Sequence, residues 1–135
     1  MSILRAFVSV FSESLPETRD FYVELFDWRV DFDSDWFVHL QARENAALEL
    51  GIIRRNHEIV PDAFRSAPAG TMITIVVPDV DALHEIAVER GLAIVEPPRD
   101  LFYGQRRMLL RDPSGTLVDV SSECAPSPEF LASLR

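Results

Sequence analysis

The sequence has little of what secreted and membrane-embedded proteins need. Cys124 is the only cysteine among 135 residues, so neither an intramolecular disulfide nor a thiolate cage around a metal can form. No apolar stretch approaches the roughly 20 residues that a membrane span requires, and no basic stretch precedes an apolar run at the N-terminus. We therefore expect a cytoplasmic protein that makes no contact with the membrane.

Basic residues are also in short supply. The chain has 13 Lys and Arg against 22 Asp and Glu, which gives a formal net charge of −9. Its largest basic clusters are the pairs Arg54-Arg55 and Arg106-Arg107. Such a chain is repelled by nucleic acid and by anionic membranes, so we expect neither as a partner. The acidity favours a neutral or cationic partner.

The chain has the composition of one soluble domain. Hydrophobic residues make up 47% of the chain and charged residues 26%, and the chain is long enough to bury a core. Apolar residues recur at helix or strand spacing, which predicts an α+β protein in which the order strand, helix, three strands occurs twice. The predicted segments are a first module at residues 1–53, a linker at 54–70, a second module at 71–123 and a tail at 124–135 with a short helix.

The predicted elements follow from the spacing of apolar and β-branched residues and from turn residues. In the first module we expect strands at 3–11, 28–32, 36–42 and 46–53 and a helix at 18–26. In the second we expect strands at 71–77, 92–95, 106–111 and 116–122, a helix at 79–90, and a loop at 97–104. The linker at 54–70 is polar and long enough to act as a flap or to allow exchange of modules between chains.

Two acidic residues stand in the middle of predicted strands. Asp119 follows the tight turn Asp112–Gly115, and Glu49 lies in the last strand of the first half. A carboxylate in the middle of a strand is disfavoured unless it is solvated or has a function. We favour a model in which the modules pack as equivalents and both acids face one shared concavity. In the alternative, one acid faces solvent or pairs with Arg5, Arg106 or Arg107.

Other side chains have two interpretations each. His39 shares a strand face with Phe37 and could act as a base or a substitute metal ligand, but a surface or hydrogen-bonded histidine is commoner and we prefer it. The three histidines do not have the spacing of metal ligands. Phe102 and Tyr103 either clamp a ligand from their loop or cover the end of the sheet.

Several motifs resemble the vicinal oxygen chelate superfamily, also called the glyoxalase/bleomycin-resistance/dioxygenase family. They are Leu15–Phe26, Val77–Asp81, Arg90-Gly91 and the segment from Arg111 to Asp119, and the resemblance extends over nearly the whole chain to Glu123. It implies two βαβββ modules whose curved mixed sheets surround a central pocket. It also implies a homodimer, in some members with swapped modules.

The resemblance implies a metal position that this chain does not match. Family enzymes hold a divalent metal with two side chains from each half, one in the opening strand and one in the closing strand. The closing-strand positions fall at Glu49 and Asp119, and the opening-strand positions fall at Phe7 and Met72. Phenylalanine cannot coordinate a metal, and a thioether suits hard divalent ions poorly. We therefore predict no cofactor, with a divalent metal at Glu49 and Asp119 as the alternative.

The loss of metal ligands is similar to the bleomycin-resistance branch, whose members bind a drug without chemistry. By that resemblance, Phe7, Phe37, Phe102 and Tyr103 stack on the ligand, Glu49 and Asp119 supply charge, and Met72 and His39 complete the lining. We expect a protein that sequesters a small organic ligand, cationic or aromatic. The alternatives are a metal-dependent lyase, isomerase or dioxygenase that recruits His39, and an accessory subunit without a ligand of its own.

Overall fold

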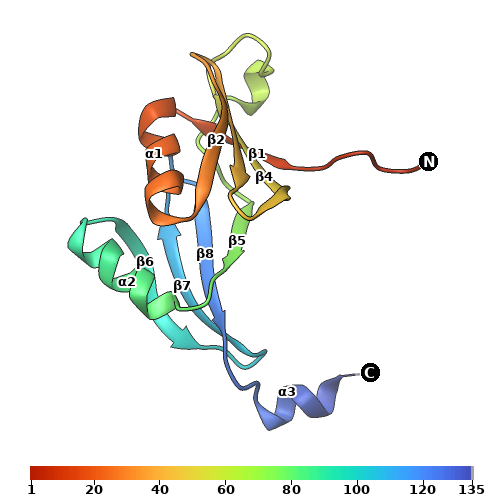
Figure 1. Ribbon diagram of the computed structural model, residues 1–135, viewed down its shortest axis with the longest axis vertical. Coiled ribbons are helices and arrows are strands. Elements are labelled where there is room, and N and C mark those ends of the chain that lie inside the picture. The colour runs from red at the N-terminus through yellow and green to blue at the C-terminus, as the bar shows by residue number, and fades with distance from the viewer. Residues whose placement is uncertain (135) are drawn as a thin grey trace. The chain divides into compact units, whose positions relative to one another are not determined.

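The structure is a computed structural model that describes residues 1–134 and divides into two compact units. The first unit contains residues 1–69 and the turn at 113–116, and the second contains the remainder. The tail predicted at 124–135 belongs to the second unit, and its last residue lies outside the described part. Each unit holds one βαβββ module, so the predicted α+β fold with two such modules is confirmed (Figure 1).

The elements follow the predicted order closely. The first module consists of β1 (Val8–Ser12), α1 (Leu15–Leu25), β2 (Trp28–Asp33), β3 (Phe37–Ala42) and β4 (Asn45–Arg54). The second consists of β5 (Met72–Val76), α2 (Val80–Glu89), β6 (Ala93–Asp100), β7 (Gln105–Arg111) and β8 (Leu117–Glu123). A short 3-10 helix (Asp62–Phe64) lies in the linker, and α3 (Pro128–Ser133) follows β8.

The two sheets have the same topology. Their strand orders are β1-β4-β3-β2 and β5-β8-β7-β6. In each sheet the opening strand pairs in parallel with the closing strand, and the other neighbours are antiparallel. The closing strand is therefore central, and a residue in its middle has a neighbouring strand on both sides.

The core of the first module shows which face of its sheet is covered by the helix. Helix α1 packs on β2, β3 and β4, and its Tyr22 is fully buried. Leu40 and Leu50 lie opposite each other across β3 and β4 and are also buried, so they face this helix. Because side chains alternate along a strand, His39 and Glu49 lie on the opposite face.

The second module repeats this arrangement around α2, which packs on β6, β7 and β8. Val118 and Val120 are fully buried on the helix side, which places Asp119 on the other face. Helix α2 begins where Asp79 accepts a hydrogen bond from the Ala82 amide at 3.2 Å and ends before Gly91, whose φ of 66° suits glycine.

Two expected strand boundaries are wrong. The first strand begins at Val8 rather than residue 3, because pairing with β4 starts at Val8 and Leu50. The strand expected at 92–95 continues to Asp100, through Pro97 and Pro98, where a loop was expected. Proline is tolerated there because β6 is an edge strand, whose outer amides need no partner.

Among residues 1–134, no helix is both long and apolar enough to cross a membrane.

Candidate binding site in the first module

A β-bulge builds the polar side of the first sheet. Val30 lies opposite Leu40 and Phe32 lies opposite His39, so Asp31 is an extra residue between them. A bulge lets two consecutive residues point to the same face of a sheet. Asp31 accordingly reaches the ring of His39, and Phe32 packs at 6.3 Å from Phe37.

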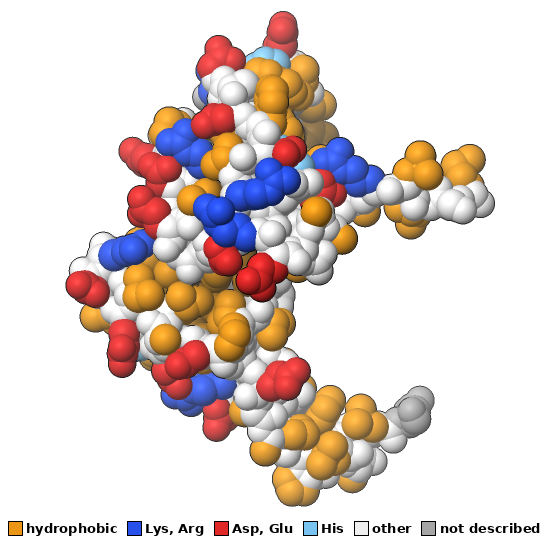
Figure 2. Space-filling view, viewed as in Figure 1, with side chains coloured by type: hydrophobic (Ala, Val, Ile, Leu, Met, Phe, Trp, Pro, Cys, Tyr) orange, Lys and Arg blue, Asp and Glu red, His pale blue; other side chains and the backbone are white. Residues whose placement is uncertain are grey.

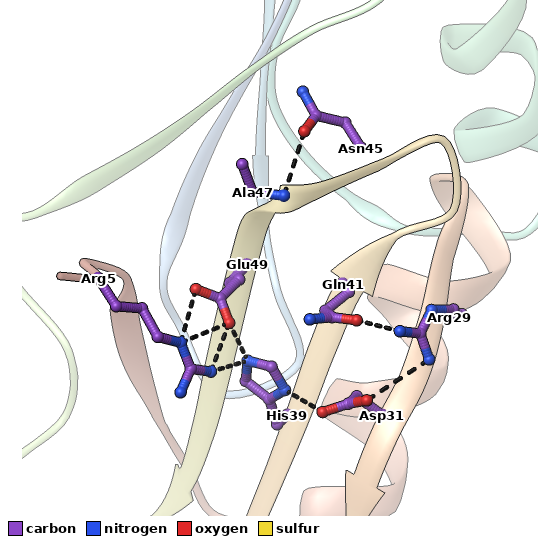
Figure 3. Close-up of polar contacts among 8 residues, drawn as sticks. All are labelled: Arg5, Arg29, Asp31, His39, Gln41, Asn45, Ala47 and Glu49. Carbon is purple, nitrogen blue, oxygen red and sulfur yellow. Dashed lines mark hydrogen bonds and ion pairs between the residues drawn. The ribbon is translucent and has the colours of Figure 1, made fainter.

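His39 is held between two carboxylates on this face. Its Nδ1 lies 2.9 Å from Asp31 Oδ2, and its Nε2 lies 2.8 Å from Glu49 Oε1 (Figure 3). A carboxylate only accepts hydrogen bonds, so a neutral ring that carries its hydrogen on Nδ1 donates to Asp31 and leaves Nε2 as an acceptor. The His39 side chain is 5% exposed, which agrees with the preferred interpretation of a hydrogen-bonded histidine but not with a surface position.

Arg5 covers the outer end of this group. Its Nε donates to both Glu49 oxygens, at 2.8 and 2.9 Å, and its Nη2 donates to Glu49 Oε1. The same Nη2 lies 2.8 Å from His39 Nε2, which accepts from it when the ring is neutral. The Arg5 side chain is 54% exposed, whereas that of Glu49 is 6% exposed. Arg5 thus shields a nearly buried carboxylate from solvent.

A hollow of about 470 Å³ opens beside these groups. Its lining contains the charged residues Arg5, Asp31 and Glu49, together with Gln41. Arg29 bonds to Asp31 at 3.5 Å and to Gln41, which fixes the far side of the network (Figure 3). The volume lies within the range of small-molecule sites.

The contacts of Glu49 change its acidity. The hydrogen bonds from Arg5 hold the pKa of the Glu49 carboxyl below its ordinary value of 4.5. The same contact with Glu49 raises the pKa of Arg5. Glu49 is therefore charged throughout the neutral range.

This lowered pKa predicts how stability depends on pH. A carboxyl whose pKa is lower in the folded state stabilises the fold fully above its unfolded value, and the contribution is lost as pH falls towards the folded value. The difference in unfolding free energy between the wild type and Glu49→Gln is therefore expected to shrink as pH is lowered from 6 to 3. Urea titrations at stepped pH measure it.

The matched control uses the main cause of the shift. In an Arg5→Ala background the same Glu49→Gln change is expected to show a weaker pH dependence, because the guanidinium is gone. Asp31 and His39 also face the Glu49 carboxyl. Both residues are therefore kept unchanged in the wild-type and Arg5→Ala backgrounds in which Glu49→Gln is measured. An unchanged pH dependence in the Arg5→Ala background contradicts the assignment of Arg5 as the main cause.

Aromatic side chains lie around the same face. The ring of Phe7 is 5.4 Å from His39, edge to face, and that of Phe37 is 6.4 Å from His39, stacked. The Cζ atom of Arg5 lies 4.8 Å from the centre of the Phe7 ring, in cation–π range. Gly51 lies close to both phenylalanines. A Cβ atom added to it would be 3.2 Å from Phe7 Cε2 and 3.0 Å from Phe37 Cε2.

Asp119 has different surroundings in the second module. It is 4% exposed and accepts hydrogen bonds from Thr74 Oγ1, at 3.2 Å, and from the Ser121 hydroxyl. Met72 lies two residues before Thr74 and is 42% exposed. Glu49 and Asp119 belong to different units, and the shared concavity stays a prediction.

Phe102 contacts the C-terminal helix, and Tyr103 contacts Phe102. Phe102 packs edge to face on Tyr103 at 5.3 Å and on Phe130 of α3 at 5.8 Å. Its backbone carbonyl accepts from the Ser127 amide at 2.8 Å. Phe102 is nevertheless 64% exposed. Their role as a ligand clamp stays a prediction.

The donor atoms around Glu49 do not fit a resident divalent metal. Both of its oxygens are bonded to Arg5, and the neighbouring Phe7 offers no donor. The part of the chain that the structure describes contains no group of three or more His, Cys, Asp or Glu side chains arranged to hold an ion. Two donors from Glu49 and His39 leave a divalent ion weakly held.

Of the ligand-binding residues expected from the sequence, the fold brings together Glu49, His39, Phe7 and Phe37. Arg5 was expected only as an alternative partner of one of the two acids. Sequence reasoning missed Asp31, because strict alternation does not foresee the bulge that turns this residue towards His39. A usable signal was present, since Asp31 is a carboxylate in mid-strand, as Glu49 and Asp119 are.

Comparison with known proteins supports the fold. The model of the Glyoxalase/Bleomycin resistance protein/Dioxygenase superfamily matches residues 5–120. A search of curated proteins found no match.

Solved structures with low sequence identity share the fold. A member of this superfamily from Sphaerobacter thermophilus DSM 20745 is similar with a TM-score of 0.72 and 20% identity, over 90% of this chain and 98% of that one. Lactoylglutathione lyase from Agrobacterium tumefaciens gives 0.68 and 16%, over 90% and 94%. The genomically encoded fosfomycin resistance protein from Listeria monocytogenes gives 0.69 and 15%, over 90% and 94%. The chain belongs to the Glyoxalase/Bleomycin resistance protein/Dioxygenase superfamily.

Proposed function

We propose that this chain binds a small organic cation in the hollow of its first module, without a resident metal ion. The observation that carries the proposal is the carboxylate of Glu49, which is nearly buried yet lies in the lining of the hollow. Arg5 already pairs with it, which shows that its surroundings accept a cation. A buried charge without a partner is costly, so this acid needs a cation at all times.

The aromatic residues support a ligand with a planar part. Phe7 and Phe37 both pack against His39, and Phe7 is 40% exposed, so its ring remains accessible to a ligand. Ring faces attract cations and stack on flat groups. Phe7 lies next to Arg5, outside the lining of the hollow, so a ligand that is both cationic and planar would pair with the carboxylate in the hollow and extend towards this ring.

Relatives in the fold include a lyase and a resistance protein, and the superfamily therefore supports a binding protein and an enzyme alike. The donor set around Glu49 favours binding without metal over a metal-dependent lyase, isomerase or dioxygenase. An aromatic cation that keeps its structure after incubation with the protein supports sequestration, whereas turnover supports the enzyme.

Titration with a simple aromatic cation tests the proposal. Benzylammonium is expected to bind the wild type, and Glu49→Gln is expected to weaken binding by roughly 10-fold to 100-fold, because a charge-assisted hydrogen bond contributes about 1.5–3 kcal/mol. Isothermal titration calorimetry measures both affinities. Benzyl alcohol, which has the same ring without the charge, is the control ligand and is expected to bind weakly to both proteins.

Equal binding of benzylammonium to the wild type and to Glu49→Gln contradicts the proposal. Binding of benzyl alcohol to the wild type as tightly as benzylammonium also contradicts it. The prediction that Asp119 contributes to the same site is measured in parallel with Asp119→Asn. A loss comparable to that of Glu49→Gln supports the shared pocket, and no loss restricts the site to the first module.

A further inference from the structure

We propose that Arg5 is a tethered occupant of a cradle for guanidinium groups, and that the cradle's ligand is a molecule with a free guanidinium. The inference rests on the proposed function. It adds the chemical class of the ligand and an explanation of how the site is closed when no ligand is bound.

Three chemically different groups form the cradle, and each contacts Arg5. Both oxygens of Glu49 accept from Nε, and His39 Nε2 lies 2.8 Å from Nη2. The ring of Phe7 lies 4.8 Å from Cζ. A planar cation with several N–H donors satisfies all three at once. An ammonium group has no plane to lay on the ring, and a neutral urea has no charge to offset the carboxylate.

Asp31 positions the acceptor of this cradle. When the neutral ring carries its hydrogen on Nδ1, the Asp31 carboxylate accepts that hydrogen at 2.9 Å, and the other ring nitrogen, Nε2, is the acceptor beside the guanidinium. Arg29 in turn holds Asp31 at 3.5 Å. The acceptor is therefore oriented before any ligand arrives, and binding does not have to order it.

The segment that carries Arg5 has few contacts of its own. Strand β1 begins only at Val8, and the preceding residues have no regular secondary structure. Ile3 is 84% exposed and Leu4 is 98% exposed, and apolar side chains are visible along this segment as it runs out from the first module (Figures 1 and 2). A weakly packed segment opens at small cost. A ligand with the same head group can therefore take the place of Arg5.

Removal of Arg5 would leave the hollow with a single sign of charge. Among residues 1–134, Arg5 is the only basic residue in its lining, whereas Asp31 and Glu49 both contribute carboxylates, of which Asp31 is paired with Arg29. Without Arg5, a nearly buried Glu49 lacks its cation. The vacated hollow therefore favours a cation over an anion or a neutral molecule.

Affinity for methylguanidinium tests the inference. If Arg5 occupies the cradle in about nine molecules of ten, its removal is expected to strengthen binding roughly tenfold, because the competent state is no longer a minority. Calorimetric titration compares the wild type with Arg5→Ala. The matched control is Arg43→Ala, which removes an arginine that is 58% exposed and pairs with Asp27 instead. It is expected to bind like the wild type.

Selectivity provides the second arm. Arg5→Ala is expected to prefer methylguanidinium to methylammonium and to N-methylurea by at least about tenfold, and the double variant Arg5→Ala/Glu49→Gln is expected to lose this preference. Equal affinity of the wild type and Arg5→Ala overturns the occupant role. Equal affinity of Arg5→Ala for the three probes overturns the cradle.

The two proposals can fail separately. If benzylammonium binds in a Glu49-dependent manner but Arg5→Ala does not strengthen methylguanidinium binding, only the inference fails. If neither the wild type nor Arg5→Ala binds any cation, both proposals fail.

If Arg5→Ala does not fold, the NMR signal of the Arg5 Nε–H group in the wild type replaces the titration. This signal is assigned by its absence in Arg5→Lys. Methylguanidinium is expected to shift this signal towards that of a solvated arginine, and an unmoved signal at saturation contradicts the inference.

Discussion

Replacing Leu40 with alanine is expected to lower the free energy of unfolding by about 2–5 kcal/mol. Leu40 is fully buried on the helix side of β3, opposite Leu50, which is 2% exposed. The deletion removes apolar surface from the core and leaves a cavity that the surrounding strands cannot close. Denaturant unfolding followed by tryptophan fluorescence measures it, because Trp28 and Trp36 both lie in the first unit.

The control for this experiment is another leucine of the same sheet. Leu48 in β4 is 54% exposed, and Leu48→Ala is expected to change the unfolding free energy by less than about 0.5 kcal/mol. Similar losses for the two variants would mean that helix α1 does not cover the face to which Leu40 points. Glu49 and His39 would then not lie on the face opposite the helix.

Replacing Gly51 with valine is expected to destabilise the first module by about 1–3 kcal/mol and to weaken ligand binding as well. A Cβ atom at this position would clash with Ser9 Oγ and lie 3.0 Å from Phe37 Cε2. It would also lie 3.2 Å from Phe7 Cε2, in the ring beneath the guanidinium of Arg5. The added methyl groups must therefore displace the aromatic side of the site.

A graded series separates this steric effect from a general effect on the strand. Gly51→Ala is expected to cost less than Gly51→Val, and Ser9→Gly is expected to restore part of the loss in Gly51→Ala by removing the shortest contact. Urea unfolding and benzylammonium titration are measured on each variant. No rescue by Ser9→Gly would contradict the close packing of β1 on β4 at this point.

Apolar periodicity was sufficient to predict the order of strands and helices in this protein. The alternation in β3, where Val38 and Leu40 are buried, records the face that packs on α1. Asp79 and Gly91 mark the two ends of α2 because one accepts an amide hydrogen bond and the other adopts a positive φ. Each of these signals depends only on residues that are close together in the chain, so each can be read from the sequence.

Strand boundaries were less predictable, because alternation shows which face a residue occupies but not whether its backbone has a partner. Residues 3–7 alternate as well as β1 does, yet pairing with β4 begins at Val8. Likewise, Pro97 and Pro98 suggest a loop, but an edge strand accommodates them. Pairing depends on the neighbouring strand and therefore on the tertiary structure.

By itself, the sequence determined that Glu49 and Asp119 are carboxylates in the middle of strands, on the faces opposite to their apolar neighbours. Only the tertiary structure decided what each acid contacts. Glu49 meets an arginine 44 positions away and a histidine 10 positions away, and the register shift in β2 adds Asp31 behind that histidine. Side-chain periodicity is a property of one strand, whereas an ion pair across a sheet needs the register of several strands, which no single segment encodes.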